Sequence, residues 1–364
     1  MAEQDLFTSA PLPVAPLGDA ERLACLQLIR SENVGPVTFR RLINHFGGAQ
    51  AALDALPALA RRGGRRQLRI LPRAEAEREL DDARTIGATP LFTIEPGYPE
   101  RLAHLDHPPP PMIYAKGRID ILDKPAVAIV GSRNCSAAGH AFARRIADHL
   151  SEAGLIIVSG LARGIDGAAH AASLERGTVA VLAGGLDNIY PPEHADLHNE
   201  IASAGCLVSE RPPGFKPRGQ AFPRRNRIIS GLAFGVVIVE AARRSGTLTT
   251  ARFALEQGRS VYAVPSHPLD PRAEGTNRLI QNGATMVISA DDVLDDLRPQ
   301  LAPTSTALAE ARPRRSRPVQ PPPMADDVSD TDRASVVAAL GPQPVHVDDL
   351  LRATGLAIPA LQVA

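Results

Sequence analysis

The sequence predicts an α/β protein built around an extended Rossmann-like, doubly wound and mostly parallel sheet. From Pro125 onward, apolar β-rich runs alternate with helical segments such as AGHAFARRIADHLSEAG. Each run is continuously apolar, which is typical of parallel strands covered by helices on both faces. Each run is also followed by a helical segment, as doubly wound sheets require. The expected strands are AVAIV, LIIVSG, VAVLAGG, CLVSE, VVIVEA and SVYAVPS.

Length and composition suit a protein of several domains. The 364 residues exceed one ordinary domain, and the 44% hydrophobic content supports a substantial core. The chain carries no net charge, which argues against a globally basic nucleic-acid binder but leaves a local basic patch possible. The three cysteines form no CxxC, the N-terminus does not resemble a signal peptide, and no run of about 18 apolar residues occurs. We therefore expect a cytoplasmic protein with no membrane association.

The region before the sheet is predicted to be a small helical domain. Residues 1–18 are Pro-rich and expected to be a disordered tail. Residues 19–82 contain a helix, a turn at Val34-Gly35-Pro36, and a second helix stopped by Gly47-Gly48. Such a pair resembles helix-hairpin-helix and sterile-alpha-motif-like modules, some of which contact DNA backbones. A small helical packing domain is the alternative.

The region after the sheet is predicted to contain a linker and a partial winged-helix-like piece. The Rossmann-like domain is expected over residues 90–297, followed by a Pro- and Arg-rich linker over residues 300–325. Residues 328–364 suggest a helix, a turn, a second helix and the start of a third, which is the spacing of a winged helix. We expect this domain to be incomplete, because the sequence stops before a recognition helix and wing.

The first predicted strand leads into a candidate anion-binding loop. In a doubly wound sheet, ligands collect at the carboxyl ends of the strands. Gly131, Ser132 and Arg133 follow the strand AVAIV, and a helix is expected to begin near Gly139. Glycine permits close backbone approach, a helix N-terminus offers N–H groups, and Arg133 adds a bidentate charge. The loop suits a phosphate but matches neither GxGxxG nor the Walker A pattern.

Two further strand ends offer similar turns. Gly160 and Gly164 follow the second strand, where Asp166 is expected to cap the next helix and His170 to lie on its surface. A functional Asp–His pair is the alternative. Ser245, Gly246 and Thr247 follow the fifth strand at the head of another helix and form a plausible anion nest.

The most basic stretch of the sequence is FPRRNRIIS, residues 222–230. No acidic residue occurs from Arg211 to Arg227. We expect residues 222–227 to form a loop over the same sheet edge, before a helix that begins with RIISGL. One of its arginines is alternatively expected to pair with Glu240 or to cap a helix. The candidate contacts are Phe222 for a base, Asn226 for a backbone or base edge, and Arg224, Arg225 and Arg227 for phosphates.

The sequence shows no complete catalytic or metal-binding pattern. His194 and His198 form HxxxH without the HExxH glutamate, so we expect surface histidines. Cys135 lacks the C-x5-R phosphatase spacing because position 141 is Ala, and no GxSxG occurs. We expect no catalytic residue, no metal and no cofactor, and a site arranged to hold phosphates.

Several ordered motifs over roughly residues 90–290 resemble the bacterial DNA-processing protein A family, also called DprA or Smf. They are AIVGSRNCSAAG, VSGLARGIDGAAH, GGLDNIYPPEH, LVSERPPG, FPRRNRIISGL, VVIVEAARRSGTLTTARFALEQGR and GTNRLIQNGA. The resemblance implies an extended Rossmann domain that binds single-stranded DNA, forms a homodimer, protects incoming DNA and loads the RecA recombinase during natural transformation. It implies no established enzymatic activity.

The resemblance also implies where DNA binds. The residues matching the family's DNA groove are Gly131-Ser132-Arg133, Gly160, Gly164 and the segment 222–227. One departure from the family pattern is Ser266, in AVPSHP, where the family usually has glycine. The loop after the sixth strand is therefore expected to differ.

Two rival function classes stay open at this point. One is a nucleotide-processing enzyme related to phosphoribohydrolases that carry PGGxGTxxE. Aligning Gly246-Thr247 with the GT of that motif puts Ala242-Arg243-Arg244 over PGG and Thr250 over the glutamate, so the catalytic carboxylate is missing. The other is a regulator that binds duplex DNA through the terminal helical modules.

Overall fold

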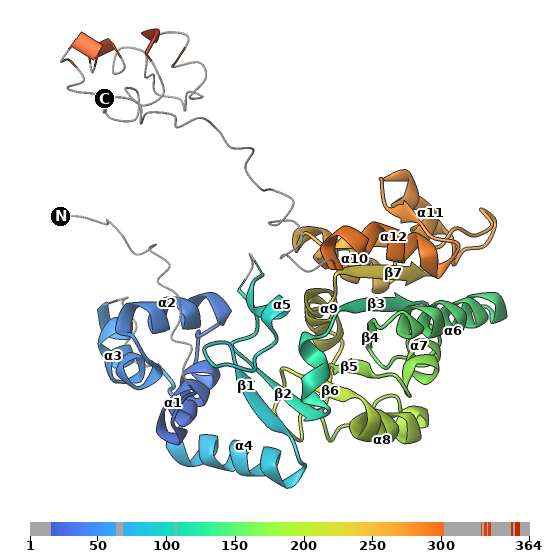
Figure 1. The fold of residues 1–364 in the computed structure, drawn as a ribbon. Coiled ribbons are helices and arrows are strands. Elements are labelled where there is room, and N and C mark those ends of the chain that lie inside the picture. The colour runs from blue at the N-terminus through green and yellow to red at the C-terminus, as the bar shows by residue number, and fades with distance from the viewer. Residues whose placement is uncertain are drawn as a thin grey trace, which may run out of the picture. The chain divides into compact units, whose positions relative to one another are not determined.

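The structure, a computed structural model, describes residues 16–62, 68–105 and 108–301, together with 329, 331, 332, 334, 335, 351 and 354–356 (Figure 1). The chain divides into two compact units, Met1–Ala302 and Pro303–Ala364. The predicted tail, linker and winged-helix-like piece lie mostly outside the described residues. The sheet and the helices packed on it belong to the first unit.

Four helices form the N-terminal region: α1 (Asp19–Arg30), α2 (Pro36–Phe46), α3 (Ala49–Arg62) and α4 (Arg73–Thr85). The predicted turn and stop are confirmed, since α2 begins at Pro36 and ends at Phe46, followed by Gly47 as its C-cap in a left-handed conformation with φ 76°. The helices bury Leu26 and Phe39 in a core that also contains Tyr114 of the sheet. The helical region therefore packs directly on the sheet domain.

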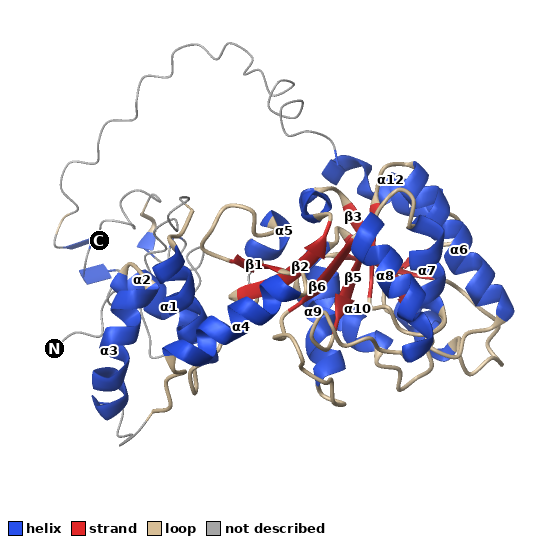
Figure 2. Ribbon diagram, turned by 90° about the horizontal axis from the view of Figure 1, so that it is seen from below, coloured by secondary structure: helices blue, strands red, loops and turns tan. Residues whose placement is uncertain are grey.

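The described strands form one nine-stranded sheet in the order β1-β2-β6-β5-β4-β3-β7-β8-β9 (Figures 1 and 2). β1 and β2 pair antiparallel with each other and β2 with β6, and the other pairings are parallel. The six predicted strands correspond to β3–β8, which confirms the Rossmann-like fold. The strands are β1 (Thr89–Phe92), β2 (Met112–Gly117), β3 (Ala126–Gly131), β4 (Ile156–Ser159), β5 (Thr178–Leu182), β6 (Cys206–Ser209), β7 (Gly235–Val239), β8 (Ser260–Ala263) and β9 (Thr285–Met286).

Helices cover both faces of the sheet. On one face Ile146 of α6 packs with Ile129 of β3, and on the other Ile228 of α9 packs with Val130. Because the central strands such as β3 are covered on both faces, both sets of their side chains are buried and apolar. No described helix is long and apolar enough to cross a membrane. The remaining helices are α5 (Glu100–Ala103), η1 (Ile119–Asp123), α6 (Ala137–Glu152), α7 (Ile165–Ser173), η2 (Pro192–His194), α8 (Ala195–Ala204), α9 (Ala221–Leu232), α10 (Thr247–Glu256), α11 (Glu274–Gln281) and α12 (Ala290–Leu301).

The strand order reverses between β3 and β7. From β3 the chain steps through β4 and β5 to β6 in one direction, and α9 then returns it so that β7 lies on the opposite side of β3. The two loops that leave the carboxyl ends of β3 and β7 diverge at this switch point, which is where open α/β sheets bind ligands. The fold thereby places residues 131–134 and 240–247 at one crevice.

Candidate nucleic-acid interface

A pocket of about 680 Å³ lies at the switch point. We call it the switch-point pocket. It is bounded by the loop after β3, the first turns of α9 and the loop between β7 and α10. The structure thus brings together nine of the thirteen predicted site residues, and leaves Gly160, Gly164, Arg224 and Arg227 outside the lining. The nine are Gly131, Ser132, Arg133, Phe222, Arg225, Asn226, Ser245, Gly246 and Thr247.

Two glycines let the loops at this edge approach one another closely. A Cβ at Gly131 would overlap the carbonyl oxygen of Val239 and lie 2.6 Å from the side chain of Ile165. Gly164, with φ 71°, is the N-cap of α7, and a Cβ there would overlap the carbonyl oxygen of Ser132. Both glycines are required by packing between the loops.

Hydrogen bonds fix the part of the pocket wall that residues 245–247 form. Thr247 Oγ1 donates to the carbonyl oxygen of Gly131 at 3.0 Å, and Asn226 Nδ2 donates to that of Gly246 at 3.3 Å. The Ser245 hydroxyl accepts from the backbone N–H of Thr247 at 3.2 Å. These polar groups tie the start of α10 to β3 and α9.

Residues 222–227 form the first turns of α9, so the predicted loop is wrong. The helix begins at Ala221 and runs to Leu232. Pro223 is compatible with this start because the first turn of a helix does not use the proline's missing N–H. Helical spacing turns the three arginines of this segment in different directions, and they have different environments.

Arg225 lies beneath the pocket, largely removed from solvent. It is 6% exposed, and its guanidinium donates to the carbonyl oxygens of Gly160, at 2.7 Å, and of Val181. Burial lowers the pKa of Arg225 to about 10. Arg225 therefore holds the glycine turn after β4 in place.

Asp166 is buried beside this turn and does not cap α7, contrary to expectation. Its Oδ2 accepts from the N–H of Gly160 at 3.2 Å and from that of Ala162 at 3.4 Å. Burial is the main cause that raises the pKa of Asp166, and the charge of Arg225 opposes that shift. The backbone turn is thus held from two sides by opposite charges.

Arg224 and Arg227 both pair with Glu210. The distances to its carboxylate are 3.0 Å and 2.7 Å, and Glu210 is only 12% exposed. Glu210 immediately precedes the acid-free stretch, so the fold supplies the acid that the stretch lacks. The expected alternative, Glu240, instead accepts from the backbone N–H of Ser136 at 2.9 Å and from its hydroxyl.

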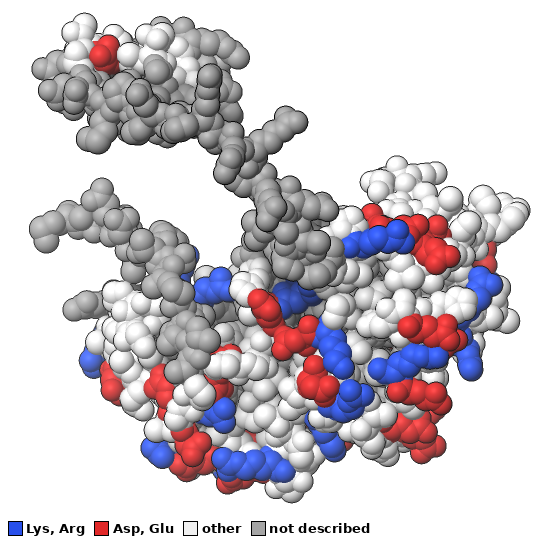
Figure 3. Space-filling view, in the orientation of Figure 1, with Lys and Arg blue, Asp and Glu red and all other residues white. Residues whose placement is uncertain are grey.

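Arg133 and Arg244 are the exposed arginines of the pocket lining. Neither has an acidic partner within the described part of the chain. The Arg133 guanidinium carbon lies 5.1 Å from the centre of the Phe222 ring. Sequence reasoning missed Arg244, although it directly precedes the predicted nest at residues 245–247. On the face shown in Figure 3, basic and acidic residues are interspersed, so the positive charge available to a ligand is local.

His170, His194 and His198 each have a different hydrogen-bond partner. His170 is buried in α7 and not on its surface, with Nδ1 2.7 Å from Thr178 Oγ1, and burial lowers its pKa to about 3. His198 is also buried, against the expectation of surface histidines, with Nε2 3.0 Å from the carbonyl oxygen of Leu186. His194 Nδ1 lies 3.2 Å from the carbonyl oxygen of Leu161. Each ring contacts a different group, so neither the Asp–His pair nor HxxxH acts as a unit.

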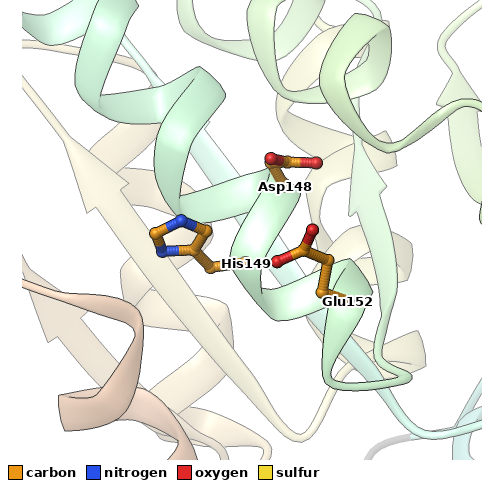
Figure 4. Close-up of side chains that lie close together, drawn as sticks. All are labelled: Asp148, His149 and Glu152. Carbon is orange, nitrogen blue, oxygen red and sulfur yellow. The ribbon is translucent and has the colours of Figure 1, made fainter.

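One cluster with metal-like spacing occurs among the described residues. Asp148, His149 and Glu152 lie on α6 with candidate ligand atoms within 4.8 Å of one another (Figure 4). Arg176 pairs with Asp148 at 2.8 Å and with Glu152 at 3.0 Å. Because the Arg176 guanidinium already pairs with both carboxylates, we assign no metal to the cluster.

Family models match this chain in three places. Residues 89–298 match the model described as DNA recombination-mediator protein A. Residues 19–82 match a DprA-like N-terminal HHH domain, and residues 320–364 match a DprA winged helix domain.

Two curated proteins and two solved structures are similar to this chain. Protein Smf of Synechocystis sp. is 33% identical over 94% of this chain and 93% of its own length. The DNA processing protein DprA of Bacillus subtilis is 46% identical over 52% of this chain, a match that spans only 65% of that protein.

The DprA structure from Streptococcus pneumoniae has a TM-score of 0.59 and 35% identity, and the match covers 70% of this chain and 85% of that chain. The Helicobacter pylori structure, described as showing a single-stranded DNA binding mode of DNA processing protein A, has a TM-score of 0.54 and 29% identity, covering 58% and 96%.

Proposed function

This chain belongs to the DNA recombination-mediator protein A family, and on that premise we propose that it binds single-stranded DNA at the switch-point pocket. One observation carries the proposal. Arg133 and Arg244 line the same pocket, both are exposed, and neither has an acidic partner among the described residues. Phosphates are the groups that such arginines bind, through charge-assisted hydrogen bonds.

The backbone around the pocket favours an anion as well. α10 begins at the pocket, with Gly246 as its N-cap, so the positive end of the helix dipole lies there. Leu161 and Glu240, at the ends of β4 and β7, have positive φ angles of 54° and 55°. Such uncommon backbone conformations cluster at functional sites.

The proposed activity is binding without catalysis. Thr250 aligns with the catalytic glutamate of the PGGxGTxxE motif, and it is buried in the pocket lining. The one carboxylate of the lining, Asp166, accepts hydrogen bonds from two backbone N–H groups. No free acid or base is therefore left in the lining for the hydrolysis of a nucleotide. A nucleotide-release assay tests this point, and release above a blank reaction would favour the enzyme.

We further propose that the chain acts as a homodimer that protects incoming DNA and loads RecA onto it. This proposal rests on family membership. Sedimentation of a fragment spanning about residues 90–297 tests self-association, and a strictly monomeric species would contradict it.

RecA loading is tested by adding the chain to RecA and a DNA strand coated with a single-strand-binding protein. Filament formation that is no faster than without the chain would contradict it.

The experiment that tests DNA binding is a titration with a labelled single strand at several salt concentrations, with unlabelled single-strand and duplex competitors. We expect affinity to fall linearly on logarithmic axes as salt rises, because each phosphate contact releases counterions. We also expect little sequence preference. Binding that is insensitive to salt would refute the proposal, and a duplex that competes as well as the single strand would favour the duplex regulator.

A further inference from the structure

Tyr190 is the exposed tyrosine of this protein. The sequence contains 4 tyrosines and no tryptophan. Tyr190 is 48% exposed, whereas Tyr98, Tyr114 and Tyr262 are 6%, 1% and 0% exposed. The hydroxyl groups of these three donate to Pro110, Glu79 and Asp296. Tyr190 differs from them in both respects, since its ring faces solvent and its hydroxyl donates to no described residue.

The ring of Tyr190 belongs to a small aromatic group beside the switch-point pocket. Its centre lies 5.5 Å from that of Phe222, and the two ring planes are inclined at 54°. Arg133 lies over the other ring of this group, with its guanidinium carbon 5.1 Å from the Phe222 centre. Because the two rings are tilted, they do not stack face to face, and an exposed face of Tyr190 is available to another flat group.

A second cavity of about 310 Å³ lies against Tyr190. Its lining is Arg133, Asn134, Ala162, Arg163, Tyr190 and Pro191. Arg133 lines this cavity and the switch-point pocket alike. It also lines a third space of about 20 Å³, which shares Phe222 with the switch-point pocket and Tyr190 with this cavity. The volume is at the lower end of the range for small-molecule pockets. A strand that leaves the switch-point pocket past Arg133 would therefore enter a cavity with one aromatic wall.

We propose that Tyr190 stacks on a base of the bound single strand, so that two consecutive nucleotides lie on either side of Arg133. One nucleotide occupies the switch-point pocket and the next occupies the cavity beside Tyr190, with the phosphate between them at Arg133. The inference rests on the proposed DNA binding at this pocket. Stacking on an aromatic ring is tolerant of sequence, since every base has a flat face.

The test compares Tyr190→Ala and Tyr190→Phe with the wild-type chain in titrations with oligothymidine. Removing a stacked ring costs about 1–3 kcal/mol, which corresponds to roughly a 5-fold to 140-fold rise in Kd for Tyr190→Ala. The salt slope stays unchanged because no charge is removed. Tyr190→Phe keeps a ring and should bind like the wild type. Leu269→Ala, which removes an 86% exposed apolar side chain outside the pockets described, is the matched control and should not change Kd.

Intrinsic fluorescence gives a second readout. The other tyrosines are buried, so oligothymidine should quench tyrosine emission in the wild-type chain and not in Tyr190→Phe, although both bind. A strand of the same length without bases should bind the wild type and Tyr190→Ala equally, because only stacking distinguishes them.

Three outcomes would overturn the inference while leaving the proposed function intact. They are an unchanged Kd in Tyr190→Ala, quenching that persists in Tyr190→Phe, and a loss in Tyr190→Ala that is equally large for the strand without bases. If the wild-type chain binds no single strand at all, the proposed function itself fails, so the two failures are distinguishable. Melting temperatures measured beside each Kd identify a variant that fails to fold.

Discussion

Arg225 and Arg133 both line the switch-point pocket. Arg225 is buried beneath it, whereas Arg133 is exposed at its edge, which we call the rim. Arg225 is 6% exposed and donates to two backbone carbonyls, whereas Arg133 is exposed and has no acidic partner among the described residues. The buried layer of Asp166 and Arg225 positions the backbone turn after β4, and the exposed rim of Arg133 and Arg244 is left for a ligand. The comparison teaches that the number of arginines in a basic motif does not give the number of charges free for a ligand, because the fold can use an arginine to hold its own backbone.

Arg224 and Arg227 are intermediate between these two groups. Their side chains are 48% and 18% exposed, and both pair with Glu210. Only Arg224 is substantially exposed, and water and salt screen an ion pair on that side. Arg224 is thus close enough to solvent for a phosphate to replace its carboxylate partner, and under the proposed function Glu210 would compete with DNA for it.

The largest expected effect is the loss of stability in Arg225→Met. Removing the guanidinium leaves two carbonyl oxygens without their donor and Asp166 without its nearest compensating charge. Breaking a buried charge network in this way costs about 3–5 kcal/mol. Urea unfolding measures the change. Arg133→Ala is the control and should stay within about 0.5 kcal/mol of the wild type. If Arg225→Met is as stable as that control, the distinction between the buried layer and the rim is wrong.

The next effect is on DNA binding by Arg133→Ala. A hydrogen bond to a charged group contributes about 1.5–3 kcal/mol, so Kd should rise roughly 10-fold to 150-fold for all sequences alike. The salt slope should fall by about 0.7 if one phosphate contact is lost on a single strand. Arg244→Ala should behave similarly. Unchanged binding in both variants, with normal melting, would remove the rim from the DNA site.

A smaller effect concerns the pH dependence of stability. Burial lowers the pKa of His170 to about 3, so below pH 6.5 the unfolded chain binds a proton that the folded chain does not. Stability should therefore fall as the pH drops from about 6.5 toward 3, by about 1.4 kcal/mol per pH unit for this group. His198, whose pKa burial also lowers, adds to the fall.

The variant His170→Asn isolates this contribution. It removes the titrating ring and keeps a polar group near Thr178. Urea unfolding at pH 7 and pH 5 should show a smaller loss on acidification than in the wild type. Equal losses in the two proteins would show that His170 is not buried in solution.

The smallest effect is expected for Glu210→Gln, which releases Arg224 and Arg227. Arg224 is the more exposed of the two arginines. An ion pair exposed on one side is worth about 0.2–1 kcal/mol, so its release should increase DNA affinity by roughly 1.4-fold to 5-fold with a steeper salt slope. Asp120→Asn, which breaks the pairs with Arg118 and Lys124, is the matched control outside the pockets described. An equal change in both variants would mean that net charge, and not the release of these arginines, is responsible.

The sequence predicted most of the sheet, because buried parallel strands are continuously apolar. It did not predict β1, β2 or β9. β1 and β9 are four and two residues long and partly exposed, and strands this short show no clear pattern. β2 is six residues long, but it lies before the alternation of strands and helices that identified the others. The rule that ligands lie at strand ends placed Gly131, Ser132 and Arg133 at the pocket from sequence alone.

The arginines of α9 could not be placed in the same way. The helix start at Ala221 has no side-chain cap, so the sequence carries no signal for a helix beginning before the apolar residues of RIISGL. The partners that decide the role of Arg225 are 65 and 44 residues away along the chain. Contacts at such separations depend on the tertiary fold, and local patterns carry no information about them.

The crowding at Gly131 bears on how this protein could evolve. A side chain there would collide with the main chain of Val239, whereas a Cβ at Gly246, on the opposite loop of the same pocket, would meet no atom within 4 Å. A side chain at position 246 therefore finds room, whereas a side chain at position 131 requires β3 and β7 to move apart. Position 246 is open to adaptation, and position 131 can change only together with the architecture of the sheet.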